Sequence, residues 1–283
     1  EKPSGLKVFQ PTAQSQPQTP PIKIGPIGQG QLAPLPGPST PLVIPATRSR
    51  LGNVQLAPAT GQFLLRKPEA GGLVPATRAD LFYSGALQGI TNDLNKSLKL
   101  PRNVPITLRH CGQVNAFYSP ASQEITLCDE WFEKMDQIFK SAKTPEARRE
   151  SAVGATAFVF AHEVGHALIH QLQIKYNGQQ ETVADQYAVY LLSGSIAGEK
   201  QIFAAAEAFG RLARENEPLT WDNHPLDEQR RYNIYCWVYG MNPPYYGKLV
   251  TDGSLPAPRA KFCPGEARDM IAGLDSDLRP HMR

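Results

Sequence analysis

One long segment, predicted to be a single buried helix, constrains the fold of this chain more than any other feature. Thr144 followed by Pro145 is typical of a helix start, because threonine caps the first turn and proline fits the first helical position. The helix is expected to run to about Gln171. Four apolar side chains at helical spacing are expected to face the core: Val153, Ala157, Val164 and Leu168. Other elements must therefore pack around this helix and cover its apolar face.

Shorter elements are expected on both sides of this helix in the sequence. Strands are predicted at Ile106–Arg109, Val114–Tyr118 and Glu124–Leu127. Turn-type residues separate the last two strands, which are expected to form a hairpin. Further helices are predicted at Leu87–Leu98, Trp131–Phe139, Thr182–Leu192, Ala197–Ala213 and Pro225–Tyr239. We therefore expect an α+β fold that is mostly helical, with a small antiparallel sheet ahead of the main helix.

The N-terminal part of the chain, residues 1–78, is predicted to be a Pro-, Gln- and Gly-rich tail or linker. Residues 1–80 contain 14 of the 26 prolines and carry a net charge of +5, whereas the rest of the chain carries −2. A segment with so little apolar periodicity buries too little apolar surface to offset the entropy that ordering it would cost. Two short sequences recur in it: Gln31–Pro34 as Gln55–Pro58, and Ile44–Arg48 as Val74–Arg78. The repeats favour an alternative, in which the tail docks on its own domain, residues 79–283, or on a partner.

Charge and hydropathy argue against two classes of function. Nucleic-acid binding needs a clustered basic face, and the folded part has a slight net negative charge. The longest apolar run, Ala152–Ala161, is about half the ~18 to 20 residues that a membrane-spanning helix needs. We therefore expect neither a nucleic-acid partner nor a transmembrane segment.

Four cysteines, all in the folded part, indicate two disulfides. Cys111 with Cys128, and Cys236 with Cys263, form two pairs close in sequence, although four cysteines permit three pairings. No spacing typical of a zinc finger is present. The alternative is four buried thiols in a cytosolic protein. Two disulfides, in a chain that begins at Glu1 as after signal-peptide removal or truncation, favour a secreted or periplasmic protein.

The long helix carries a pattern typical of a metal site, His162-Glu-Val-Gly-His166. Two histidines four residues apart lie on one helix face, so both imidazoles can reach the same ion. Glu163 stands beside the first ligand, where it can take a proton from a zinc-bound water whose pKa is lowered to around 7. The residues on both sides of the motif are uncharged and apolar, as expected of a helix below an active-site floor. The pattern predicts one Zn²⁺ per chain, with Glu163 as general base.

A third ligand has to come from another segment. A histidine six residues after His166 would complete a three-histidine pattern, but that position is Leu172. Glu181 and Asp185 stand four residues apart at the start of a predicted helix. We expect Glu181 to bind the metal and Asp185 to orient a ligand histidine through its second ring nitrogen. The alternatives are an exchange of these two roles, or two acids at a solvated helix start.

With these residues the sequence resembles the gluzincin metallopeptidases, whose pattern is His-Glu-x-x-His followed by Glu-x-x-x-Asp. It is more closely similar to a family described as metallopeptidases and otherwise of unknown function. The segments that carry this similarity are Cys111–Tyr118, Ile125–Cys128, Ala184–Gln186 and Asp227–Asn233. The resemblance covers about residues 80–266 and implies a zincin-like fold with an active-site helix.

Two further segments resemble those of the CAAX-prenyl endopeptidase group of gluzincins. Asn115, Ala116 and Phe117 resemble the edge strand along which such enzymes pair an extended substrate. His224, followed six residues later by Arg230, resembles the segment that brings a histidine and an arginine to the active site. The resemblance implies that both stabilise the developing oxyanion. The alternative for His224 is a surface histidine at a helix start.

The sequence therefore predicts a secreted zinc metallopeptidase that acts on a peptide or protein substrate. One alternative is a zinc-bearing module that binds without catalysis, displayed on a flexible tail. Another is a latent enzyme that its own tail inhibits. His170 continues the row of His166, but it lies ~12 Å along the helix axis from His162, too far to share its ion. A structural or surface role is expected for His170.

Overall fold

In the computed structural model of the chain, the long predicted helix is present as α4, Pro145–Gln171. It begins as expected: Oγ1 of Thr144 accepts a hydrogen bond from the N–H of Ala147 at 3.1 Å, and Pro145 is in the first turn. Three of its four predicted core residues are buried, and Val153 is partly buried. The helix is therefore the central element that the other elements cover.

The structure describes residues 61–68, 81–82, 85–215 and 225–283. All of them belong to one unit, Val54–Arg283, so most of the predicted tail lies outside the described residues. Among the described residues, α4 is the one helix long and apolar enough to cross a membrane. However, 83% of its most apolar window is buried inside the fold, which is typical of a core helix.

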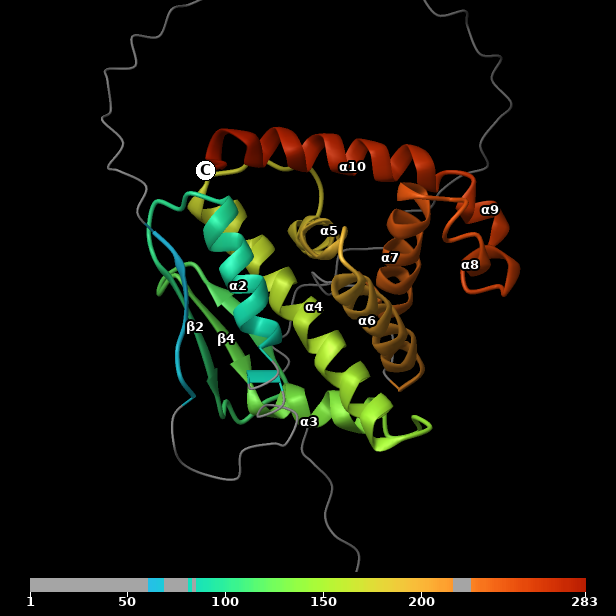
Figure 1. Ribbon diagram of the computed structural model, residues 1–283, viewed down its shortest axis with the longest axis horizontal. Helices are drawn as coiled ribbons and strands as arrows, with labels where there is room; N and C mark the ends of the chain where they lie inside the picture. Colours follow the sequence, from blue (N-terminus) through green and yellow to red (C-terminus); the bar gives the residue numbers. More distant parts are fainter. Residues whose placement is uncertain (1–60, 69–80, 83–84, 216–224) are drawn as a thin grey trace, which may run out of the picture. The chain divides into compact units, whose positions relative to one another are not determined.

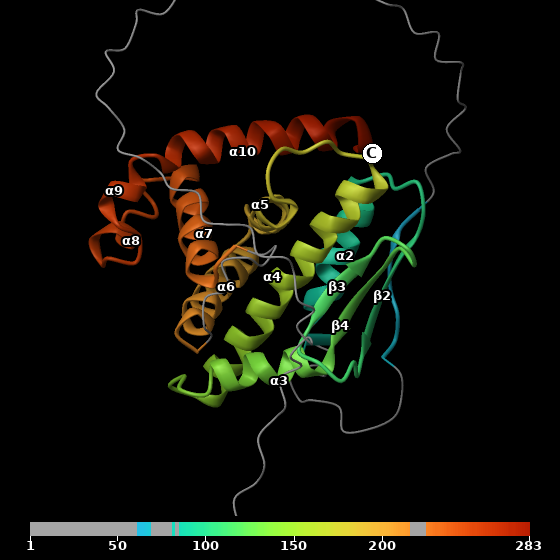
Figure 2. The same ribbon diagram turned by 180° about the vertical axis from the view of Figure 1, so that it is seen from behind.

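A four-stranded sheet lies on one side of α4 (Figures 1 and 2). Its strands are β1 (Phe63–Leu65), β2 (Val104–Arg109), β3 (Ala116–Ser119) and β4 (Glu124–Cys128). Their order in the sheet is β1-β2-β4-β3. β3 and β4 form the predicted antiparallel hairpin, whereas β1 with β2 and β2 with β4 are parallel pairs. The sheet is therefore mixed, and the prediction of an antiparallel sheet was wrong for these two pairs.

The position of β4 explains the mixed sheet. β4 is inserted between β2 and β3, so the hairpin turn sends it back in the direction of β2. Ile125 and Leu127 of β4 are fully buried, as expected of a strand with neighbours on both sides. β1 falls inside residues 1–78, the segment predicted to be a tail. Its Phe63 exchanges two hydrogen bonds with the Asn95 side chain, at 2.8 and 2.9 Å, so this part of the segment belongs to the folded domain.

The helices form two layers next to the sheet (Figures 1 and 2). α2 and α4 lie against it, and α5, α6 and α7 lie beyond α4, while α10 packs on α7. The longer helices are α2 (Ala86–Ser97), α3 (Asp129–Ile138), α5 (Gln180–Leu192), α6 (Ile196–Glu215), α7 (Asp227–Met241) and α10 (Cys263–Leu278). The short ones are α8 (Lys248–Thr251), α9 (Ala257–Ala260) and the 3₁₀ turn η1 (Arg279–His281). The α+β prediction is confirmed.

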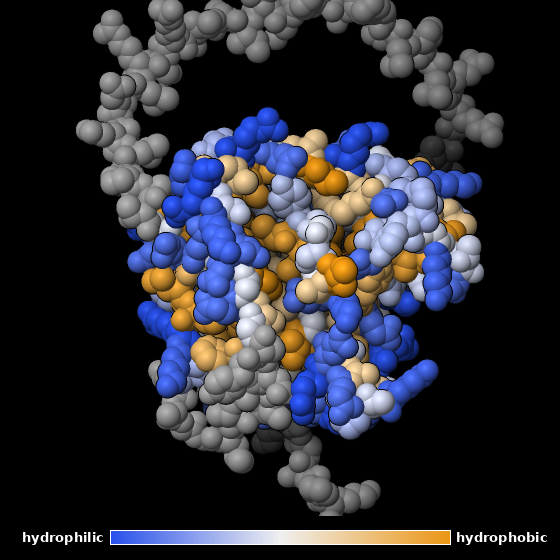
Figure 3. All heavy atoms as spheres, in the orientation of Figure 1, coloured by the Kyte–Doolittle hydropathy of each residue, from blue (hydrophilic) through white to orange (hydrophobic). Residues whose placement is uncertain are grey.

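A cavity with a volume of about 820 Å³ lies between α2 and the start of α6. Figure 3 shows apolar side chains gathered beside α2 on this face. Its wall is made mostly of small and apolar residues, among them Gly89, Ile90, Leu94 and Ala197. None of the described residues predicted to carry chemistry lines it.

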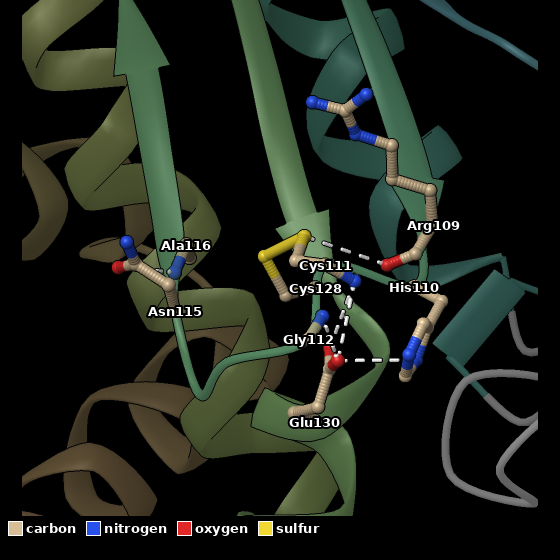
Figure 4. Close-up of a disulfide and its surroundings, with 8 residues drawn as sticks. All are labelled: Arg109, His110, Cys111, Gly112, Asn115, Ala116, Cys128 and Glu130. Carbon is tan, nitrogen blue, oxygen red and sulfur yellow. Dashed lines mark hydrogen bonds and ion pairs between the residues drawn. A yellow bond between two sulfur atoms is a disulfide. The ribbon is translucent and has the colours of Figure 1, made fainter. Parts of the chain in front are cut away.

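Two disulfides form, so the prediction of paired cysteines is confirmed and the pairing is settled. Cys111 bonds to Cys128 and joins the loop after β2 to the end of β4 (Figure 4). Cys236 bonds to Cys263 and joins α7 to α10. Disulfides persist in oxidising compartments, which favours an environment outside the cytosol.

Removing the second disulfide is expected to lower the free energy of unfolding by about 3 kcal/mol. The bond closes a long loop in the unfolded chain, and without it the unfolded chain gains conformational entropy. Cys236 and Cys263 are both fully buried, and serine at both positions keeps nearly the same size. The measurement is a urea unfolding curve of the double Cys→Ser variant beside the oxidised parent. A midpoint equal to that of the parent would contradict the expectation.

Candidate metal centre

Three predicted ligand side chains meet at one point of the structure. His162 and His166 stand one turn apart on α4, and Glu181 lies in the first turn of α5. Nε2 of His162 is 3.1 Å from Nε2 of His166. Oε2 of Glu181 is 3.2 Å from the first of these nitrogens and 3.3 Å from the second. Two imidazole nitrogens and one carboxylate oxygen, all within 4.8 Å of one another, fit a divalent transition metal.

A glycine inside the motif allows α5 to approach this closely. A Cβ at Gly165 would lie 2.9 Å from the Cβ of Tyr187 and 3.1 Å from the Cα of Ala184. Real side chains do not tolerate contacts of this kind, so any other residue at this position would push α5 away from α4. The glycine thus places Glu181 within reach of both histidines.

The second nitrogen of His162 is held by a buried carboxylate. Nδ1 of His162 is 2.8 Å from Oδ1 of Asp185. The guanidinium of Arg230 donates two hydrogen bonds to Asp185, from Nε at 2.8 Å and from Nη2 at 2.6 Å. All three side chains are buried, with exposed fractions of 4%, 2% and 9%. The guanidinium of Arg230 also stacks 3.9 Å from the centre of the Phe209 ring. His162 on α4 is therefore held through Asp185 on α5, Arg230 on α7 and Phe209 on α6.

Burial and charge act in opposite directions on these groups in the metal-free protein. Burial lowers the pKa of His162, but the carboxylates of Asp185 and Glu181 outweigh it and raise this pKa to about 9. Burial raises the pKa of Asp185, but the charge of Arg230 and the hydrogen bond of His162 outweigh it and hold this pKa well below its usual range. Asp185 and Arg230 are therefore an ionised pair.

The predicted base, Glu163, is also buried beside the cluster. Its Oε2 accepts a hydrogen bond from the backbone N–H of Tyr118 in β3, at 2.7 Å. Burial raises the pKa of Glu163, and the charges of His162 and His166 offset this only in part. A carboxyl whose pKa is raised toward neutrality is suited to both accepting and donating a proton.

A cleft of about 530 Å³ opens at the metal centre between β3 and the C-terminal half of α4. Asn115, Ala116 and Phe117, predicted to form a substrate edge strand, line it. β3 is an edge strand of the sheet, and its backbone on the side away from β4 faces the cleft. The Oδ1 atom of Asn115 accepts the N–H of Ala116 at 2.9 Å, and both residues appear in Figure 4.

A comparison with known families decides the assignment of the chain. The DUF4344 family, whose description is "Putative metallopeptidase", matches residues 76–273, which is more than half of the chain. The chain belongs to this family. No curated protein and no solved structure was found to match it. Membership implies a metal-dependent hydrolase, and the cluster of two histidines and one glutamate offers the metal a fitting set of ligands.

In this metallopeptidase family member, Arg230 does not occupy the place that the sequence comparison implied. It was predicted to stabilise an oxyanion, but it does not line the cleft, and its guanidinium fork is bound to Asp185. The position of Arg230 in the predicted helix gave no information on the direction in which its long side chain would extend. His224, predicted to act with Arg230, lies outside the described residues.

Two cleft residues of this metallopeptidase were missed by the sequence analysis. Tyr118 had been included only as a strand residue, although it stands two positions after Ala116 and its backbone therefore faces the same side. The alternation of backbone direction along a strand was the signal that could have placed Tyr118 at the cleft. His170 had been assigned a structural or surface role, but it lines the cleft, and its Nδ1 is 2.9 Å from the hydroxyl of Tyr118.

A second group with metal-ligand residue types does not form a metal site. Cys111, Cys128 and Glu130 lie close together, but the two sulfurs are bonded to each other. The Glu130 carboxylate accepts the backbone N–H groups of Cys111 and Gly112, and it lies 3.0 Å from Nδ1 of His110 (Figure 4). Glu130 therefore holds the loop between β2 and β3.

Proposed function

We propose that this chain is a zinc peptidase of the gluzincin kind, secreted or periplasmic, that hydrolyses peptide bonds with Glu163 as general base. The observation that carries the proposal is the convergence of His162, His166 and Glu181 at one end of a cleft with an open strand edge. Two imidazoles and a carboxylate are the ligand set of a catalytic zinc with one position left for water or substrate. The two disulfides support export from the cytosol.

An extended peptide is the substrate that the cleft fits. β3 has no neighbouring strand on the side away from β4, so its backbone groups there, apart from the N–H of Tyr118 that holds Glu163, are offered to a peptide that lies beside it as an added strand. Main-chain hydrogen bonds would then hold the peptide with one of its carbonyl groups near the three ligand side chains. The N–H of Ala116, which now bonds to the side chain of the preceding Asn115, is free to exchange that partner for the peptide.

Glu163 performs the proton transfers of the reaction. When bound, zinc supplies Lewis-acid activation of water and of the peptide carbonyl. Glu163 accepts the proton that the attacking water loses and then gives it to the nitrogen of the leaving amine. The N–H of Tyr118 fixes the carboxylate through one oxygen, which leaves the other oxygen for the proton.

Asp185 and Arg230 position a ligand and do not touch the substrate. By accepting a hydrogen bond at Nδ1, Asp185 fixes the tautomer of His162 in which Nε2 is free to bind a metal. Arg230 in turn prevents Asp185 from rotating, because its fork engages both carboxylate oxygens.

Replacing Glu181 with alanine is expected to weaken zinc binding by more than about 100-fold, since loss of a direct ligand should exceed the ~10- to 100-fold effect of losing an outer partner. The measurement is competition with a chelator of known affinity. Glu133→Ala, which removes an exposed carboxylate on α3, serves as the matched control and should bind zinc like the parent. Undiminished affinity in Glu181→Ala, with loss in Asp185→Ala, would reverse the two roles.

A further inference from the structure

The far end of the cleft differs in charge from the metal end. The acidic residues that line the cleft, Glu163 and Glu181, stand at the metal centre. One turn of α4 beyond His166, the polar side chains of the lining are His170, Gln173 and Lys175, which stand among apolar residues such as Ile169 and Ile174. Among the described residues, this part of the wall contains no carboxylate. A substrate group bound there meets positive charge and N–H groups.

The loop after α4 is folded so that it belongs to this wall. The N–H of Ile174 donates to the carbonyl of Ile169 at 3.0 Å, and the Nε2 of Gln173 donates to the carbonyl of His170 at 2.7 Å. These bonds turn the loop back over the last turn of the helix. They also satisfy helix-end carbonyls that would otherwise repel an anion.

The two basic side chains are available to a ligand. Lys175 is exposed and makes no ion pair with any described residue. Nδ1 of His170 is 2.9 Å from the Tyr118 hydroxyl, and the direction of this hydrogen bond depends on the tautomer of the ring. When the hydroxyl donates, the other nitrogen of His170, Nε2, carries the ring proton and is a donor; in an imidazolium both ring nitrogens are donors.

We propose that His170 and Lys175 form a carboxylate-binding subsite that selects peptides with an acidic group close to the scissile bond. This inference rests on the proposed function and names its substrate class. His170 lies one helix turn, about 6 Å, from His166. An extended peptide spans that length with about two residues. The carboxylate therefore belongs to a chain terminus or to an acidic side chain within about two residues of the cleaved bond.

The test uses the full chain with the Glu163→Gln substitution, loaded with zinc, so that bound peptides stay intact. Three pooled hexapeptide libraries, all acetylated, are offered: one with a free C-terminal carboxylate, one amidated, and one amidated with a single glutamate at each position in turn. Peptides retained after gel filtration are counted by mass spectrometry. We expect about tenfold greater retention of a carboxylate library than of the neutral one, as for a hydrogen-bonded charge. The first and third libraries distinguish a terminal carboxylate from a side-chain carboxylate.

Lys175→Gln and His170→Gln, added separately, are expected to reduce this preference to near onefold. Lys143→Gln is the matched control, because Lys143 is exposed and precedes α4 at its opposite end. Lys175 is at the surface, so its substitution tests the proposal even if the histidine variant does not fold. Equal retention of charged and neutral libraries, or a preference that survives in Lys175→Gln, would overturn the subsite and leave the peptidase proposal standing. Retention of no peptide at all would overturn both.

Discussion

Replacing Glu163 with glutamine is expected to slow peptide hydrolysis by about 100- to 10,000-fold, the usual contribution of a positioned general base. Glutamine keeps the size of the side chain and an oxygen that can accept the N–H of Tyr118. It cannot take the proton of the attacking water. Zinc content should stay at one per chain, because Glu163 is not one of the three side chains grouped as ligands.

The measurement pairs initial cleavage rates with metal analysis on the same samples. Glu146→Gln is the matched control: it makes the same change at an exposed position in the first turn of α4, and its rate should equal that of the parent. Normal cleavage by Glu163→Gln with bound zinc would show that another group takes the proton.

Replacing Asp185 with alanine is expected to lower the free energy of unfolding of the metal-free protein by about 3 to 5 kcal/mol, the cost of breaking one side of a buried ion pair. The substitution leaves Arg230 charged and buried with its fork unpaired, and it leaves Nδ1 of His162 without its acceptor. Metal-free protein is specified because bound metal would add its own stabilisation. Urea unfolding gives the difference directly.

A second readout separates positioning from general stability. Zinc affinity of Asp185→Ala should fall by about 10- to 100-fold, since the His162 ring loses its fixed orientation. Asp269→Ala, which removes an exposed carboxylate on α10 that makes only a surface ion pair with Arg268, should change stability by less than about 0.5 kcal/mol and leave zinc affinity unchanged. A loss below about 1 kcal/mol in Asp185→Ala would mean that Arg230 finds another partner.

Elements specified by neighbouring residues were predictable from the sequence. The start of α4 at Thr144 and Pro145 depends on a cap and a ring geometry that act within one turn, and both are present in the structure. The β3 and β4 hairpin has a local turn signal as well. The parallel pairing of β2 with β4 does not, because it joins segments that no short-range pattern relates. β1 was missed for the same reason, since its three residues lie in proline-rich surroundings and are held by β2 and Asn95.

The candidate site divides in a similar way. His162 and His166 share a helix face by spacing alone, so their convergence could be predicted. The placement of Glu181 beside them depends on the close packing of α5 on Gly165, a tertiary contact. The direction of the Arg230 side chain depends on a buried carboxylate from a different helix. Sequence spacing carries no information on that choice, and the oxyanion role implied for Arg230 was therefore misplaced.

The most direct test of the account is cleavage of a diverse peptide library by the full chain containing one zinc per chain, with cut sites identified by mass spectrometry. We predict cuts that disappear when the zinc is removed and return when it is restored, and that are absent with Glu163→Gln. If zinc is bound at one per chain and no peptide is cut, the central claim is contradicted, and the fold serves as a zinc-bearing binding module or a latent enzyme.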